Sequence, residues 1–141
     1  MKHASSSHSS YYLRYHIIWT CKYRRKVLKP DIKAYFLRLL PTLLEASPGV
    51  SLEAIGFDLD HLHMVLTIPP KYAVSDVVGR LKSQSASRLR KKFAWLGKVY
   101  WDDPGVVWSE GYYVSSVGLN EAQIKSYVKK QGRRDANAWS A

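Results

Sequence analysis

The sequence is short of several features, and each shortage excludes a class of protein. Among its 141 residues there is a single cysteine, Cys21, which excludes an internal disulfide and a thiolate zinc site of the CxxC type. No apolar run approaches the roughly 20 residues that cross a bilayer, and the polar start lacks the apolar stretch of a signal peptide. We therefore expect a protein of the reducing cytoplasm without a membrane partner.

Acidic residues are also scarce. Eleven Asp and Glu stand against 22 Lys and Arg, a formal net charge of +11 on 16.2 kDa. The basic residues gather at 22–26, 88–92 and 129–134, with Tyr and Trp interleaved. Each cluster by itself could be a solvated face, but phosphate neutralisation combined with base stacking on aromatic rings is how proteins hold single strands. The composition therefore favours a nucleic-acid partner.

The length suits one domain with an ordinary core. We expect a flexible N-terminal arm at 1–10, a single domain at 11–133 and a C-terminal tail at 134–141. The predicted strands lie at 11–21, 50–57, 60–68, 106–108 and 112–117. The predicted helices run from a cap at Asp31 to the stop at 47–49 with a kink at Pro41, from a cap at Ser75 to about Trp95, and onward from a capping box at Asn120.

The order of these elements predicts the fold class. Strand, helix, strand, strand, helix, strand suggests an α+β, ferredoxin-like or RRM-like antiparallel sheet with helices on one face, followed by a C-terminal helix. Strands 50–57 and 60–68 should pair as a hairpin. Because many unrelated proteins share this plan, the fold alone does not define an activity.

The strand at 60–68 holds the first candidate for chemistry. His61 and His63 stand two residues apart, so an extended strand points both imidazoles to one face, where they can grip a divalent metal. The alternative interpretation is a polar strand face or a hydrogen-bonded core histidine. His16, alone on the first predicted strand, is interpreted as structural, and His3 and His8 as part of the arm.

The last predicted helix holds the second candidate. Tyr127 and Gln131 lie four residues apart, so they share one helix face a turn apart. Taken alone, this pair is typical of a half-buried tyrosine beside a solvated amide. Its interest comes from the combination with a His-hydrophobic-His strand in a small, basic chain.

That combination resembles the single-tyrosine HUH transposases, the TnpA-like enzymes of small insertion sequences that move as single-stranded DNA. The resemblance runs from about Tyr11 to Gln131. Its ordered motifs are Tyr15-His16-Ile17-Ile18-Trp19, Lys22-Tyr23-Arg24-Arg25-Lys26-Val27-Leu28, Asp60-His61-Leu62-His63, Pro69-Pro70-Lys71-Tyr72, Arg80-Leu81-Lys82, Trp108-Ser109 and Tyr127-Val128-Lys129-Lys130-Gln131.

The resemblance implies a role for each candidate. Tyr127, on the C-terminal helix, would be the catalytic nucleophile, and His61, His63 and Gln131 would bind Mg²⁺ or Mn²⁺. The implied reaction cleaves and rejoins single-stranded DNA through a 5′-phosphotyrosine intermediate, without a nucleotide cofactor; the absence of a GxxxxGK[ST] loop agrees with this. The expected DNA contacts are Lys22, Arg24, Arg25, Lys26, Arg80, Lys82, Arg88, Lys91 and Lys92.

The resemblance also implies partners. These are DNA hairpins near the ends of an insertion sequence and a second copy of the chain, with each active site completed in trans. Two alternatives remain open: a domesticated relative acting on repeated extragenic palindromes, and a non-catalytic module for single-stranded DNA or RNA. A zinc hydrolase is disfavoured because the sequence has no HEXXH motif.

Overall fold

The computed structural model describes residues 4–6, 9–11 and 13–117 of the chain. At its centre is a four-stranded antiparallel sheet in the order β4-β5-β3-β6. Its strands are β3 (Arg14–Thr20), β4 (Ser51–Phe57), β5 (His61–Thr67) and β6 (Tyr113–Ser116). If these four strands are numbered 1 to 4 along the chain, their order across the sheet is 2-3-1-4. This is the ferredoxin-like order, so the predicted α+β class is confirmed.

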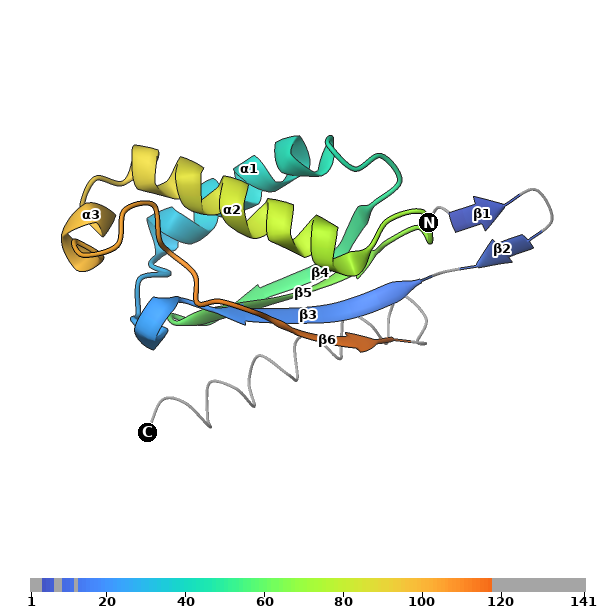
Figure 1. Ribbon diagram of the computed structural model, residues 1–141, viewed down its shortest axis with the longest axis horizontal. Helices are drawn as coiled ribbons and strands as arrows, with labels where there is room; N and C mark the ends of the chain where they lie inside the picture. The colour runs from blue at the N-terminus through green and yellow to red at the C-terminus, as the bar shows by residue number, and fades with distance from the viewer. Residues whose placement is uncertain (1–3, 7–8, 12, 118–141) are drawn as a thin grey trace.

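Two long helices cover one face of this sheet (Figure 1). They are α1 (Pro30–Leu44) and α2 (Val74–Lys92); a short helix, α3 (Leu96–Val99), follows α2, and a 3-10 turn, η1 (Lys22–Arg24), follows β3. None of the described helices is long and apolar enough to span a membrane.

The N-terminal segment forms a separate two-stranded hairpin. It pairs β1 (Ala4–Ser6) with β2 (Ser9–Tyr11) in the region where the sequence predicts a flexible arm. The C-terminal predictions, which include the helix from Asn120, Tyr127, Gln131 and the tail, lie outside the described residues.

Strand alternation divides the central strands between two environments. Ile17 and Trp19 of β3, and Leu62 and Met64 of β5, join α1 and α2 in one apolar core. Their neighbours along each strand face the other side of the sheet. Every residue of β5 is nevertheless buried. The side chains of this strand are therefore enclosed on both faces of the sheet, apolar on the helix face and mostly polar on the other.

Two of the predicted helix caps lie in the described residues, and both are displaced. Helix α1 begins at Pro30 with Lys29 as its N-cap, and the Asp31 carboxylate accepts the neighbouring Ile32 N–H at 2.9 Å from inside the first turn. Proline at the first helical position explains the shift, because its fixed φ starts the helix and its missing N–H would be unsatisfied there in any case. Helix α1 then continues through Pro41.

Helix α2 has Ala73 rather than Ser75 as its N-cap and makes no side-chain cap hydrogen bond. It ends at Lys92 and not near Trp95, because Phe93 adopts an extended backbone with φ of −118° and ψ of 92°. Leu96 then starts α3 and is fully buried. The apolar residues of α2 and α3 therefore follow one helical spacing in the sequence, although the backbone breaks the helix at Phe93.

The predicted strand at 106–108 is also absent as a strand; it contributes only a bridge between Cys21 and Trp108. The pairing stops there because the chain after β3 turns into η1 at Lys22, and the Val106 carbonyl accepts a hydrogen bond from Arg90 at 2.7 Å. The following prediction agrees closely, because β6 spans Tyr113–Ser116 within the predicted 112–117.

Candidate metal centre

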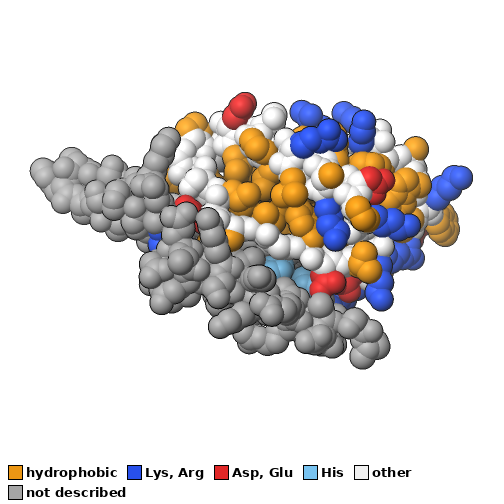
Figure 2. Space-filling model, turned by 180° about the vertical axis from the view of Figure 1, so that it is seen from behind, with side chains coloured by type: hydrophobic (Ala, Val, Ile, Leu, Met, Phe, Trp, Pro, Cys, Tyr) orange, Lys and Arg blue, Asp and Glu red, His pale blue; other side chains and the backbone are white. Residues whose placement is uncertain are grey.

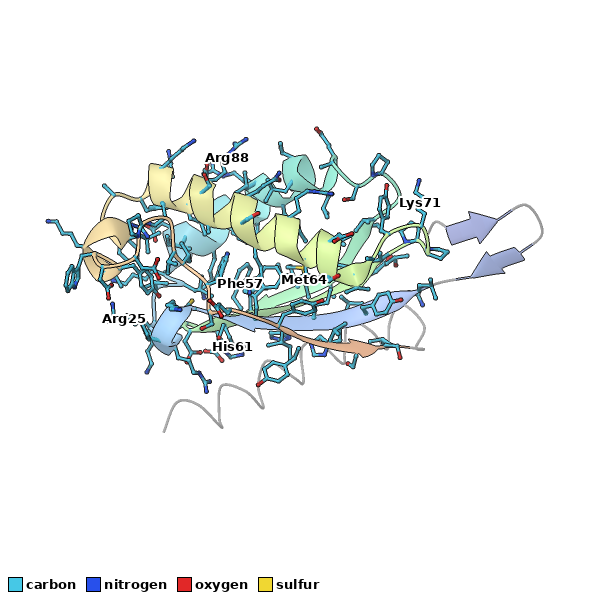
Figure 3. The ribbon with its side chains drawn as sticks, viewed as in Figure 1. Arg25, Phe57, His61, Met64, Lys71 and Arg88 are labelled. Carbon is cyan, nitrogen blue, oxygen red and sulfur yellow. The ribbon has the colours of Figure 1, made fainter. Side chains whose placement is uncertain are left out.

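The two histidines of β5 lie on the sheet face turned away from the helices. Figure 3 shows His61 on one side of the sheet and Met64 and Phe57 between the sheet and the helices. The rings of His61 and His63 are nearly parallel, with centroids 6.0 Å apart and planes inclined by 25°. Both side chains are almost completely buried.

Asp60 holds the first of these rings. Its Oδ1 lies 2.9 Å from Nδ1 of His61, and because an ionised carboxylate only accepts hydrogen bonds, the imidazole donates from Nδ1. The lone pair of His61 is then on Nε2, the nitrogen that would coordinate a cation. Metal-binding imidazoles usually donate their other ring N–H to a carboxylate in this way, which fixes the orientation of the ring.

Gly56 makes room for the second ring. It stands directly opposite His63 in the β4–β5 ladder. A Cβ built on Gly56 would lie 2.8 Å from Nε2 and 3.0 Å from Cε1 of His63, closer than non-bonded atoms approach. The absence of a side chain at position 56 therefore permits the observed orientation of His63.

A third imidazole reaches the same region from β3. The ring of His16 lies edge-on to that of His63, with centroids 5.8 Å apart and planes inclined by 72°, and His16 is buried. Sequence reasoning treated His16 as an isolated structural residue. Its alternation with buried Ile17 and Trp19 was a signal that it faces away from the apolar core, but pairing with β5 is needed to bring it to His63.

The described side chains fit part of a divalent-metal site. Imidazole nitrogens are common ligands of divalent metals, and the Asp60 contact orients His61 for that role. Within the described segments, no group of three His, Cys, Asp or Glu side chains could hold a metal by itself. A complete site therefore needs a further ligand, and the predicted one, Gln131, lies outside those segments.

The predicted DNA-contact residues separate into three groups. The first follows β3, where Arg24, Arg25 and Lys26 are exposed and Lys22 is half-buried. This group adjoins the histidines, because Nε of Arg24 lies 3.6 Å from Oδ2 of Asp60. Figure 2 shows Lys and Arg side chains gathered toward the end of the molecule that carries η1 and α3, and histidine side chains on its underside beside acidic ones.

The second group ties parts of the chain together. Arg80 donates to Oγ of Ser47 at 2.5 Å, and Nζ of Lys82 donates to the carbonyls of Ser109 at 2.7 Å and Gly111 at 2.5 Å. Burial lowers the pKa of Lys82 from its ordinary value, and the nearby Glu110 carboxylate opposes that shift. Both side chains thus form hydrogen bonds that join distant segments of the chain.

The third group lies on the exposed surface of α2 and comprises Arg88, Lys91 and Lys92. Figure 3 shows Arg88 above the helix layer, on the side of the molecule opposite His61. A nucleic acid bound along this surface would be separated from the histidines by the helices and the sheet. The structure therefore brings the η1 cations, and not those of α2, to the histidine pair.

A ferredoxin-like sheet with paired imidazoles on the face opposite α1 and α2 defines the structural class of this protein. The sequence from 9 to 131 matches the family described as "Transposase IS200 like". With this match and the relatives below, the chain belongs to the IS200-like transposase family.

Two relatives come from mobile elements. The transposase of insertion sequence element IS200 from Salmonella typhimurium is 37% identical over 131 residues, which cover 93% of this chain and 84% of that protein. The ISDra2 transposase TnpA of Deinococcus radiodurans is 33% identical over 122 residues, covering 86% of this chain and 85% of that protein.

Two solved structures share the fold. A crystal structure of a candidate transposase from Deinococcus radiodurans R1 superposes with a TM-score of 0.72 at 31% identity, covering 93% of this chain and 98% of that one. A REP-associated tyrosine transposase bound to a REP hairpin superposes with a TM-score of 0.61 at 12% identity, covering 93% of this chain and 74% of that one. At 12% identity the second likeness concerns the fold alone.

Proposed function

We propose that this transposase binds hairpins at the ends of an insertion sequence and cleaves and rejoins single-stranded DNA through a 5′-phosphotyrosine on Tyr127. The observation that carries the proposal is the arrangement of His61 and His63 on one sheet face, with the Asp60 carboxylate 2.9 Å behind His61. The identity to insertion-sequence transposases supports the same reading.

The proposed metal ligands are His61, His63 and Gln131. A bound Mg²⁺ or Mn²⁺ supplies electrostatic stabilisation to the phosphoryl oxygens and the departing 3′ oxygen. The chain's own contribution is orientation. Asp60 fixes which nitrogen of His61 would face a bound cation, and the missing side chain at Gly56 leaves room for the ring of His63.

The proposed nucleophile needs activation. The phenol of tyrosine ordinarily has a pKa near 10, so only about one molecule in a thousand is phenolate at pH 7, a deficit of about 4 kcal/mol. Attack by Oη of Tyr127 forms the tyrosyl phosphate ester and breaks the bond to the 3′ oxygen, which takes up a proton as a 3′-OH. One phosphate ester bond replaces another, so the phosphate remains a diester. The 3′-OH of another strand can therefore reverse the step without an energy-rich cofactor.

The proposed substrate is a DNA hairpin with a single-stranded extension. The net charge of +11 favours a polyanion, and the fold relative at 12% identity was solved with a REP hairpin. The Lys22–Arg25 cations next to Asp60 are the group best placed to contact phosphates near the histidines.

The direct test is replacement of the nucleophile. Tyr127→Phe should abolish covalent protein–DNA adducts on hairpin-bearing oligonucleotides and leave hairpin affinity largely intact, and EDTA should have the same effect on the wild type. Adducts are measured as a shifted band on a denaturing gel. A matched variant, Tyr113→Phe, should still form adducts. An adduct that persists in Tyr127→Phe would contradict the assignment.

We also propose a homodimer in which the Tyr127 helix of one chain completes the metal site of the other. Mixing inactive His61→Ala and Tyr127→Phe chains should then restore some cleavage, because a hybrid dimer contains one site with all its residues. Subunit exchange is verified with two affinity tags. Failure to recover cleavage after proven exchange would favour a site built within each chain.

The alternatives give different outcomes in the same assays. A non-catalytic single-strand or RNA module would bind equally well in EDTA and form no adduct. A domesticated relative acting on extragenic palindromes would form adducts on such palindromes, as a monomer, and not on insertion-sequence ends.

A further inference from the structure

The turn after β3 exposes the aromatic ring of Tyr23 to solvent and has left-handed backbone dihedral angles. Tyr23 is 60% exposed and has φ of 57° and ψ of 17°, and the next residue, Arg24, has φ of 52°. These left-handed values are uncommon for residues other than glycine, and they persist only where the surrounding structure imposes them.

The surroundings of Tyr23 do impose this backbone. The N–H of Lys22 donates to the Val107 carbonyl at 2.8 Å, and the N–H of Arg24 donates to the Cys21 carbonyl at 2.8 Å. The Tyr100 hydroxyl donates to the Lys22 carbonyl at 3.0 Å. Lys22, on one side of Tyr23, is thus anchored to two distant segments, and the bond from Arg24, on the other side, closes the turn, so the exposed ring projects from a fixed base.

Cations flank the exposed ring. Nζ of Lys22 lies 5.4 Å and Cζ of Arg25 lies 5.2 Å from the centroid of Tyr23. Arg25 also lies 5.4 Å from the centroid of Tyr100 and donates to the Val99 carbonyl. An exposed aromatic ring beside fixed positive charge has the two features that hold single-stranded nucleic acid, a surface for base stacking and partners for phosphates.

The same turn is connected to the candidate metal centre. Arg24 Nε lies 3.6 Å from Oδ2 of Asp60, and Oδ1 of that carboxylate lies 2.9 Å from Nδ1 of His61. Tyr23 is therefore separated from a proposed metal ligand by its neighbour Arg24 and one carboxylate. A strand whose scissile phosphate lay at His61 would therefore run close to this turn.

We propose that the ring of Tyr23 stacks on an unpaired base adjacent to the scissile phosphate and so sets the position of the single strand in the active site. The inference rests on the proposed function and adds a residue that positions the substrate. It commits to an unpaired base, because the bases of a duplex already stack on each other and offer no free face to a protein ring. Tyr23 should therefore be dispensable for binding the hairpin itself.

The test uses a fluorescent base, 2-aminopurine, whose emission is quenched by stacking. The probe is placed at successive positions in the single-stranded extension of a hairpin oligonucleotide, and emission is measured with the full-length Tyr127→Phe chain, which holds the DNA uncleaved. We expect a protein-dependent quench at one position next to the bond that wild-type protein cleaves. Tyr23→Ala should remove this quench, and Tyr23→Phe, which keeps the ring, should retain it.

Affinity provides the second readout. Tyr23→Ala should weaken binding of the hairpin with its extension by about tenfold, within the usual range for losing one base–aromatic stack. Binding of the hairpin without the extension should stay within about twofold of the parent. An equal loss for both oligonucleotides would overturn the proposal, because it would mean that Tyr23 contributes to hairpin binding or to the fold.

Tyr23→Asn separates the ring from the backbone. Asparagine adopts the left-handed conformation more readily than tyrosine, so this variant should unfold at a temperature no lower than the Tyr23→Phe variant and still lose the quench. Such a result excludes misfolding as the cause.

A second exposed tyrosine, Tyr113, is an alternative stacking surface. Tyr113 of β6 is 73% exposed and stands opposite Ile18, which stands opposite His63 on the other side of β3. We expect Tyr113→Ala to retain the quench. Loss of the quench in Tyr113→Ala, with retention in Tyr23→Ala, would overturn the proposal in favour of the sheet face.

The two proposals fail in distinguishable ways. If wild-type protein forms no adduct but the Tyr23-dependent quench is present, stacking stands as a binding contact and the catalytic assignment fails. If wild-type protein forms adducts at a defined bond while the Tyr127→Phe chain shows the same quench at every position with and without Tyr23→Ala, the stacking inference alone fails.

Discussion

The two faces of the central sheet are equally buried at β5 but chemically opposed. On the helix face, Leu62, Met64 and Leu66 pack into the main core. On the other face, His61, His63 and Thr67 are enclosed to the same degree, and the one apolar residue there, Val65, belongs to a small separate cluster. Because adjacent residues of a strand point to opposite faces, one strand can stabilise the fold with one set of side chains and hold reactive groups with the other.

This comparison predicts that changes on the two faces have separable effects. Substitutions on the histidine face should affect metal binding and cleavage more than stability, and substitutions on the helix face should do the reverse. The following variants test that separation, beginning with the largest expected effect.

His63→Ala should reduce adduct formation by at least about 1,000-fold. Loss of a proposed ligand would remove metal-derived charge stabilisation, which amounts to several kcal/mol, and each 1.36 kcal/mol is tenfold in rate. Adduct yield over time in Mg²⁺ or Mn²⁺ is the measurement. Met64→Leu, one residue away on the helix face and similar in volume, should remain within about threefold of wild type. Equal losses in the two variants would refute the separation of the faces.

Leu66→Ala should lower the free energy of unfolding by about 2–5 kcal/mol, because it removes a fully buried side chain from the main core and leaves a cavity. The neighbouring Val65→Ala, on the histidine face, should cost less, about 1–2 kcal/mol, since its cluster is small. Urea unfolding followed by circular dichroism measures both. A larger loss for Val65→Ala would mean that the histidine face carries the greater share of stability.

Gly56→Ala should weaken Mn²⁺ binding by about 10- to 100-fold, the usual effect of disturbing the support of a ligand. The added Cβ would lie 2.8 Å from Nε2 of His63 and force the ring to turn. Titration followed by electron paramagnetic resonance measures the affinity of the full chain. The matched variant is Gly79→Ala in α2, where a Cβ would meet nothing within 4 Å. It should leave metal affinity unchanged, and stabilise the helix by about 1 kcal/mol.

Cys21 offers a smaller test on the helix face. Burial, reinforced by the Asp60 charge, raises its pKa from 9.0 to about 12, so the native thiol should resist aromatic disulfide reagents at pH 8 and react once the chain unfolds in urea. The raised folded pKa also means that this group's contribution to stability is complete below pH 9 and declines between pH 9 and about 12, as the unfolded thiol ionises first.

The measurements for Cys21 are the labelling rate in native buffer and in urea, and the urea midpoint at pH 8 and pH 10.5. Cys21→Ala should reduce the fall in the midpoint between these pH values. Labelling of the native protein as fast as the unfolded chain would show that the helix face opens readily at the end of β3.

Local patterns predicted much of the fold. Period-two alternation located β5 and placed two histidines on one face, and helical spacing located α1 and α2. The errors occurred where another interaction overrode the local signal. Pro30 displaced the Asp31 cap, and the turn into η1 at Lys22 ended the pairing that the predicted strand at 106–108 would have extended.

The sequence by itself determined that His61 and His63 share a face, because their spacing of two is a local property of any strand. Tertiary structure alone decided that His16 lies beside His63, that Gly56 lies beneath it and that Arg24 reaches Asp60. These contacts join segments far apart in the chain, and their register depends on how whole strands pair. It also decided that α2 sets Arg88 on the side of the molecule opposite His61, since the helices pack on the other face of the sheet.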